Sequence, residues 1–189
     1  MKSNEETQPL RQEYWLTEDG QLSFWDDPSV YGGVNFPEFY EPYTHIQPIL
    51  DKVRAGFLDE HDFALLKVIG DAIAPNEEQI KRIFAEKNLT KSNVINRMKR
   101  MRERGFLDRW HIRSHETEDV YPNFSAPVTL GVAGYILMKH YFRPHFFMDS
   151  MQWDRLGLTS IQRFVATNEI RVRLFEAAVM KNWVWNGII

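Results

Sequence analysis

Cysteine is absent from this chain of 189 residues. Without a thiol, the protein cannot build a disulfide scaffold, a thiolate zinc finger or a cysteine nucleophile. Long apolar runs are also missing, since none approaches the ~20 residues that a membrane-spanning helix requires. Residues 1–6 are polar and acidic, unlike a signal peptide. We therefore expect a cytoplasmic protein without a membrane partner.

Motifs for catalysis or cofactor binding are missing as well. The pair Gly32-Gly33 is not followed by the Lys-Ser helix of a phosphate-binding loop, and no serine lies in a nucleophile elbow. His111 and His115 have the spacing of metal ligands, but on a strand and a turn the two side chains need not converge. We expect no enzymatic activity, no catalytic residue, no cofactor and no metal site.

Charge is unevenly distributed along the chain, although the formal net charge is only −3. Residues 1–78 carry 5 Lys/Arg and 16 Asp/Glu, whereas residues 79–113 carry 11 Lys/Arg and 3 Asp/Glu. The solvated face of a helix usually interleaves the two signs. A compact basic block inside an acidic chain instead indicates an anionic partner that is met by one face of the protein.

Residues 1–55 show no helical periodicity. They hold five prolines and many aromatic side chains, a composition too aromatic for simple disorder and too proline-rich for regular structure. We expect an extended arm that packs against the domain or a partner. A short hairpin at Asp19-Gly20 is an option, because this dipeptide favours a tight turn.

From Asp59 onward the pattern becomes helical. Apolar residues recur at three- and four-residue spacing until Pro75, and Asn76 then caps a second helix over residues 76–87. Thr90 caps a third helix, which ends near Gly105. Three short helices in this order predict a helix-turn-helix.

A hairpin should follow the third helix. Residues 106–113 have the pattern of a strand, 114–119 that of a polar turn, and 126–130 that of the returning strand. We therefore predict a mainly α fold with a small β-wing (α+β), in which residues 56–131 form a winged-helix DNA-binding domain. The wing tip is acidic, with Glu116, Glu118 and Asp119, so we expect its minor-groove contacts to be weak.

The third helix divides into an apolar stripe and a polar face. Val94, Ile95, Met98 and Met101 should dock on the first two helices. In the major groove, asparagine pairs with adenine and arginine with guanine, while other cations suit phosphates. The residues we predict to contact DNA, including two on the following strand, are Lys91, Ser92, Asn93, Asn96, Arg97, Lys99, Arg100, Arg104, Arg109 and Arg113. The alternative is an adaptor, because many winged-helix domains bind proteins instead.

Helical pattern returns at about 132–141 and again from Thr159 to Asn182, so residues 132–189 form a helical extension. Ile161, Phe164, Val165, Val172, Phe175 and Val179 make an apolar face on the longer helix. This face either completes the core of the monomer or forms a homodimer, which would place two recognition helices about one DNA turn apart. Asn168 lies near the stripe and is expected to bridge to a neighbouring segment.

Residues of about 60–180 resemble the replication-relaxation family of plasmid-encoded proteins. In the segment 128–134, Leu130 and Gly134 fit the family pattern aromatic-x-Leu-Thr-x-x-Gly. In the segment 163–172, Ala166, Asn168, Arg171 and Val172 fit the pattern His-x-Leu-Ala-x-Asn-Asp-x-Arg-Val, with Arg163 at the histidine position. The resemblance implies a role in plasmid replication, in DNA relaxation during mobilisation or in transcriptional control, with replication or relaxase proteins as partners.

Overall fold

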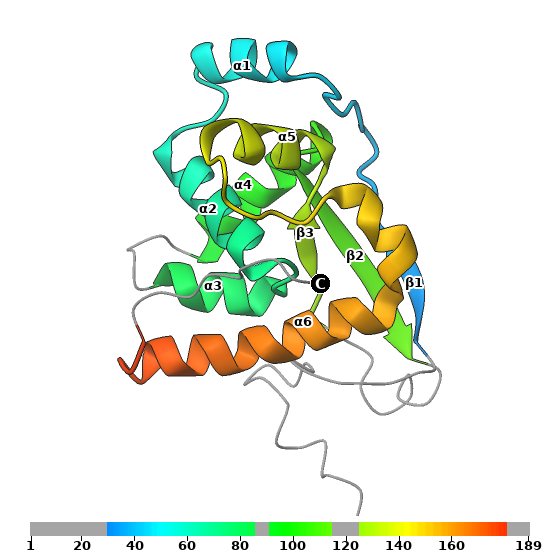
Figure 1. Ribbon diagram of the computed structural model, residues 1–189, viewed down its shortest axis with the longest axis vertical. Coiled ribbons are helices and arrows are strands. Elements are labelled where there is room, and N and C mark those ends of the chain that lie inside the picture. The colour runs from blue at the N-terminus through cyan, green and yellow to red at the C-terminus, as the bar shows by residue number, and fades with distance from the viewer. Residues whose placement is uncertain (1–29, 86–90, 115–124, 181–189) are drawn as a thin grey trace, which may run out of the picture.

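Helices supply most of the computed structural model, which describes residues 30–85, 91–114 and 125–180. With a three-stranded antiparallel sheet they form an α+β fold, as the sequence predicts (Figure 1). In chain order the elements are β1 (Val30–Val34), α1 (Ile46–Arg54), α2 (Glu60–Ala72), α3 (Glu77–Ala85), α4 (Lys91–Glu103), β2 (Leu107–Ser114), β3 (Val128–Leu130), α5 (Val132–Tyr141), the short 3-10 helix η2 (Ser150–Gln152) and α6 (Trp153–Glu176).

Helices α2 and α3 each begin with a pair of residues that cap one another. The Asp59 carboxylate accepts from the Asp62 amide at 3.0 Å, and the Asp62 carboxylate accepts from the Asp59 amide at 3.0 Å. Asn76 and Gln79 make the same pair at the start of α3, at 2.8 and 3.0 Å. Each pair satisfies amides that the first turn leaves without a carbonyl partner. Asn76 is therefore the cap that the sequence predicts.

Helix α4 ends at Glu103, close to Gly105, where the sequence predicts its end. Gly105 has a φ of +70°, a left-handed conformation that glycine adopts without steric cost. The Phe106 amide donates to the Met101 carbonyl at 3.0 Å and closes the last turn. The predicted cap at the other end, Thr90, lies outside the described residues.

Strand β2 is the centre of the sheet and pairs antiparallel with β1 and β3. The β2–β3 pair is the hairpin that the sequence predicts, whereas the acidic turn between the two strands lies outside the described part of the chain. Neighbouring residues of a strand point to opposite faces. Accordingly, Leu107 packs into one apolar core with α2, α4 and α5, and Trp110 and Ile112 pack into a second core with α6.

Residues 30–55 correct the prediction of an extended arm, because they contain β1 and α1. Strand β1 adds to the predicted hairpin, with Val30 opposite Ser114 and Val34 opposite Trp110. Pro48 lies in the first turn of α1, where its missing N–H would have had no helical partner. A proline at this position is compatible with a helix. Residues 1–29, with the proposed hairpin at Asp19-Gly20, lie outside the described residues.

Helix α6 begins at Trp153, earlier than the predicted start at Thr159. Gly157, with a φ of +70°, kinks the helix near its start. The kink interrupts the helical periodicity from which the start at Thr159 was predicted.

Figure 1 shows α6 running beside α3 and reaching β1. Of the predicted apolar face, Ile161, Val165 and Val172 are buried. Val179, predicted for the same face, lies beyond the end of α6 at Glu176 and is 74% exposed. No helix in the described segments is both long and apolar enough to cross a membrane.

The approach of β1 to β2 yields a test of the fold. Gly32 has a φ of +137°, and a Cβ atom there would lie 1.9 Å from the carbonyl oxygen of His111, whereas a Cβ on Gly33 would meet nothing within 4 Å. We expect Gly32→Ala to lower the free energy of unfolding by about 1–3 kcal/mol, because the two strands must separate to fit the methyl group. Urea denaturation measures the loss, and Gly33→Ala is the matched control. Equal stability of the two variants would contradict the strand pairing.

Candidate nucleic-acid interface

Helix α4 carries a buried face and an exposed face. Val94, Met98 and Met101 are buried, as the sequence predicts. Ile95, predicted for the same stripe, is 43% exposed. Successive helical residues point about 100° apart, so Ile95 turns away from the core that Val94 enters. The exposed side chains beside it are Asn93, Asn96 and Lys99.

Arg97 and Arg100 form ion pairs with the start of α2. Nη1 of Arg97 lies 2.7 and 2.8 Å from the two carboxylate oxygens of Asp59, and 2.8 Å from Oδ1 of Asp62. Arg100 donates to Oδ2 of Asp62, and its guanidinium lies 5.2 Å from the centroid of the Phe57 ring. Both arginines, which the sequence assigns to DNA, therefore have partners within the protein.

The carboxylate of Asp62 is fully buried and accepts hydrogen bonds from three donors. It accepts from the Asp59 amide as part of the capping pair and from both arginines of α4. Desolvation raises the pKa of the neighbouring Asp59, but hydrogen bonds from Arg97 and from the Asp62 amide outweigh it and lower the pKa to about 2. The ion pair between Asp59 and Arg97 therefore persists through the physiological pH range.

A segment that we call the strap, residues 35–43, crosses the C-terminal end of α4. The amides of Glu41 and Tyr43 donate to the carbonyls of Glu103 and Arg104 at 3.0 and 3.4 Å. These carbonyls belong to the last turn, which has no helical donor for them. The Glu41 carboxylate also pairs with the Arg104 guanidinium. Arg104, predicted to contact phosphate, is thus held by the strap.

The remaining predicted residues lie on β2 and at the start of α4. Nε of Arg109 donates to Glu77 at 2.6 Å, so this arginine joins β2 to α3. Arg113 is exposed at the far end of β2. The side chains of Lys91 and Ser92 lie outside the described part of the structure.

The prediction of the interface missed the acidic residues that form ion pairs with its arginines. Asp59, Asp62 and Glu77 stand at or near helix starts, where acids are expected for capping alone. The available signal was the charge segregation, because an acidic stretch and a basic stretch in one chain attract each other. Much of the basic block thus finds its counter-charge inside the protein.

Asp108, on β2, is a half-buried residue whose Oδ1 atom is buried. Burial raises its pKa to about 6, although the nearby Arg102 cation opposes the rise, and its Oδ1 has no hydrogen-bond partner. Arg102 reaches the strap, donating to the Asn35 carbonyl at 2.6 Å, while its Nε is buried without a partner. Burial, and then the charge of Asp108, raise the pKa of Tyr40 to about 12.

The residues that carry the family resemblance attach α6 to the helices before α4. Nδ2 of Asn168 donates to the Ala72 carbonyl at 2.8 Å, which is the predicted bridge to a neighbouring segment. Glu169 pairs with Arg82 of α3 at 2.9 Å, and Arg171 is buried. The exposed Arg163 takes no part in these contacts between the described elements. These residues therefore support the frame on which α4 rests.

Asp108 yields a prediction about pH. Its folded-state pKa of about 6 lies above the ordinary value of 3.8, so the folded protein holds this proton more tightly than the unfolded chain does. The resulting stabilisation is complete below about pH 4 and is lost as the pH rises through about 6. The Asp108→Asn side chain stays neutral at every pH. We therefore expect the stability of this variant relative to the wild type to rise by about 1–3 kcal/mol between pH 4 and pH 8. Chemical denaturation at both pH values measures this, and parallel pH dependences would contradict it.

In comparisons with known proteins, no family model, no curated protein and no solved structure matches the chain. Within the described residues, no group of three or more His, Asp or Glu side chains is placed to hold a metal ion, and His115 of the pair considered above lies outside them. The resemblance to the replication-relaxation family stays a prediction.

Proposed function

We propose that the protein binds double-stranded DNA through the amino-terminal half of α4, in the manner of a winged helix. The observation that carries this proposal is the order α2, α3, α4 and then the β2–β3 hairpin, with Asn93, Asn96 and Lys99 exposed on the third helix. A winged helix inserts its third helix into the major groove and lays the hairpin near the adjacent backbone. The exposed residues are of the types that such a helix uses.

The residues of α4 that we predict to contact DNA have different roles, according to whether they are already paired within the protein. Asn93 and Asn96 are the candidate base readers, because asparagine pairs with adenine through two hydrogen bonds. Lys99 is exposed and suits a phosphate. Arg97 loses the role of base reader, since it would have to leave two carboxylates to reach a guanine.

The ion pairs also limit the electrostatic share of DNA affinity. Each phosphate contact contributes about −0.9 to the slope of log K against log salt. If Lys99 and roughly two further cations touch phosphates, the slope is about −3. A protein using the whole basic block would have a much steeper slope. Sequence selectivity through the asparagines, rather than general attraction to a polyanion, is therefore central to the proposal.

The biological process that we propose rests on the resemblance of residues of about 60–180 to the replication-relaxation family. It points to plasmid replication, to DNA relaxation during mobilisation or to transcriptional control, and it makes replication or relaxase proteins candidate partners. A homodimer through α6 would suit a palindromic DNA site. A dimer would have to form outside the buried face of α6, because Ile161, Val165 and Val172 already pack within one molecule.

A second candidate function is a protein adaptor without intrinsic DNA binding. The observations that favour it are the pairing of Arg97, Arg100 and Arg104 with carboxylates and the exposure of Ile95 on the outer side of α4. An apolar side chain between polar ones suits a protein interface better than a DNA groove. In this case the outer face of α4 would bind another protein.

Band-shift titration of the full chain separates the two functions. A duplex is first selected from a random-sequence library and then titrated at several salt concentrations. We expect Asn96→Ala to lose about 1–3 kcal/mol of discrimination between this duplex and an unrelated one, because a bidentate contact to a base is removed. Lys99→Ala should weaken binding to both duplexes equally and make the salt slope shallower by about 0.9.

The matched control is Arg163→Ala, which removes an exposed cation from α6 outside the proposed surface. Its affinity and salt slope should equal those of the wild type. Failure to bind any duplex at low salt would overturn DNA binding and leave the adaptor. An Asn96→Ala variant that weakens all duplexes equally would move Asn96 from base reading to phosphate contact.

A further inference from the structure

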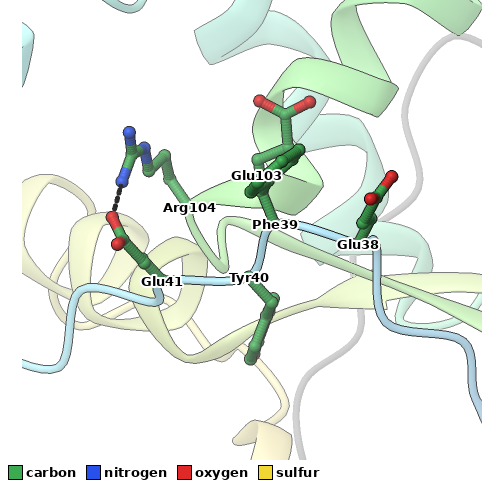
Figure 2. A pocket seen from close by; sticks show the side chains of 6 residues that line it. All are labelled: Glu38, Phe39, Tyr40, Glu41, Glu103 and Arg104. Atoms are coloured by element: carbon green, nitrogen blue, oxygen red, sulfur yellow. Dashed lines mark hydrogen bonds and ion pairs between the residues drawn. The ribbon is translucent and has the colours of Figure 1, made fainter.

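A pocket of about 530 Å³ opens between the strap and the C-terminal end of α4. Its lining, drawn in Figure 2, consists of Glu38, Phe39, Tyr40, Glu41, Glu103 and Arg104. The volume falls in the range of about 300–1,000 Å³ that is common for ligand pockets. It is sufficient for a long side chain and part of a second one.

The lining carries uncompensated negative charge. Arg104 is the one cation among the six residues, and it is already paired with Glu41. The carboxylates of Glu38 and Glu103 form no ion pair with another residue of the described segments. Figure 2 shows both directed to the same side of the strap as Phe39, whereas Tyr40 points the other way. A cation entering from this side meets two unneutralised carboxylates.

An aromatic ring supplies the second part of the recognition chemistry. Phe39 is 75% exposed, although its neighbours in the strap are anchored to α4 through backbone hydrogen bonds. The strap therefore presents an apolar ring to solvent, where a partner side chain can pack against it. The face of a phenyl ring attracts ammonium and guanidinium groups and also packs against apolar side chains. DNA phosphate would be repelled by the carboxylates beside it.

We propose that this pocket binds a lysine or arginine side chain that a protein partner carries next to an apolar residue. The cation lies between the carboxylates of Glu38 and Glu103, and the apolar residue packs on Phe39. The site does not depend on the proposed DNA contact. Along the helix axis Glu103 lies about 15 Å from Asn93 and about 6 Å from Lys99, so a partner in the pocket borders the phosphate contact and leaves the asparagine contact accessible.

Peptide titration of the isotope-labelled full chain, followed by NMR, tests the proposal. The probe is acetyl-Leu-Arg-Leu-Arg-amide, and the charge-reversed control is acetyl-Leu-Glu-Leu-Glu-amide. We expect saturable shifts of the backbone signals of residues 38–41 and 103–104 with the first peptide alone. Affinity should fall in high salt, because exposed ion pairs are screened.

Three variants identify the groups responsible. Phe39→Ala should weaken binding about two- to fivefold through loss of the contact with the apolar residue of the peptide. The double variant Glu38→Gln, Glu103→Gln should abolish saturation, while Asp154→Asn, an exposed acid at the start of α6, should bind as the wild type does. Equal binding of the acidic peptide, wild-type affinity in the double variant, or shifts confined to other residues would overturn the proposal. Shifts of the signals of residues 38–41 by duplex DNA would instead assign the pocket to the DNA interface.

Discussion

The buried carboxylate of Asp62 connects the start of α2 to the middle of α4, and the candidate interface depends on this junction. It completes the capping pair with Asp59 and also binds Arg97 and Arg100. An exposed ion pair contributes at most about 1 kcal/mol, but removing one partner of a buried pair costs several times more. Because both arginines are paired with carboxylates, the side chains of α4 that are left for an external partner are Asn93, Asn96 and Lys99, with Ile95 beside them. One interaction thus fixes the helix and selects its exposed residues.

The same pairing explains the uneven charge of the chain. Acidic residues within 1–78 and basic residues within 79–113 are distant in sequence, but Asp59, Glu41 and Glu77 each meet an arginine of the second stretch. The segregation therefore serves intramolecular attraction as well as any external partner. A basic stretch alone overstates the charge that a polyanion would meet, because part of it is already neutralised. What remains exposed on α4 is mostly polar, apart from Ile95, with an acidic pocket at the C-terminal end of the helix.

Much of the fold could be predicted because its signals are local. Asn76 caps a helix through its own side chain, and Gly105 ends one through its own φ, so the boundaries of α3 and α4 follow from short stretches of sequence. Strand β1 could not be predicted, because its pairing with β2 joins residues about 80 positions apart and has no local turn signal. The exposed positions of α4 follow from helical periodicity, except Ile95, which the pattern places in the buried stripe. The partners of its arginines do not, because periodicity gives the direction of a side chain and not what stands opposite it.

The central claim is that the arginines of α4 stay with their carboxylates while the asparagine and lysine side chains meet DNA. Side-chain NMR of the labelled full chain, recorded with and without a selected duplex, tests this directly. The account predicts shifts of the Asn96 amide and Lys99 ammonium signals, with the Nε–H signals of Arg97 and Arg100 unchanged. Shifted arginine signals, with those of Asn96 and Lys99 unchanged, would contradict it.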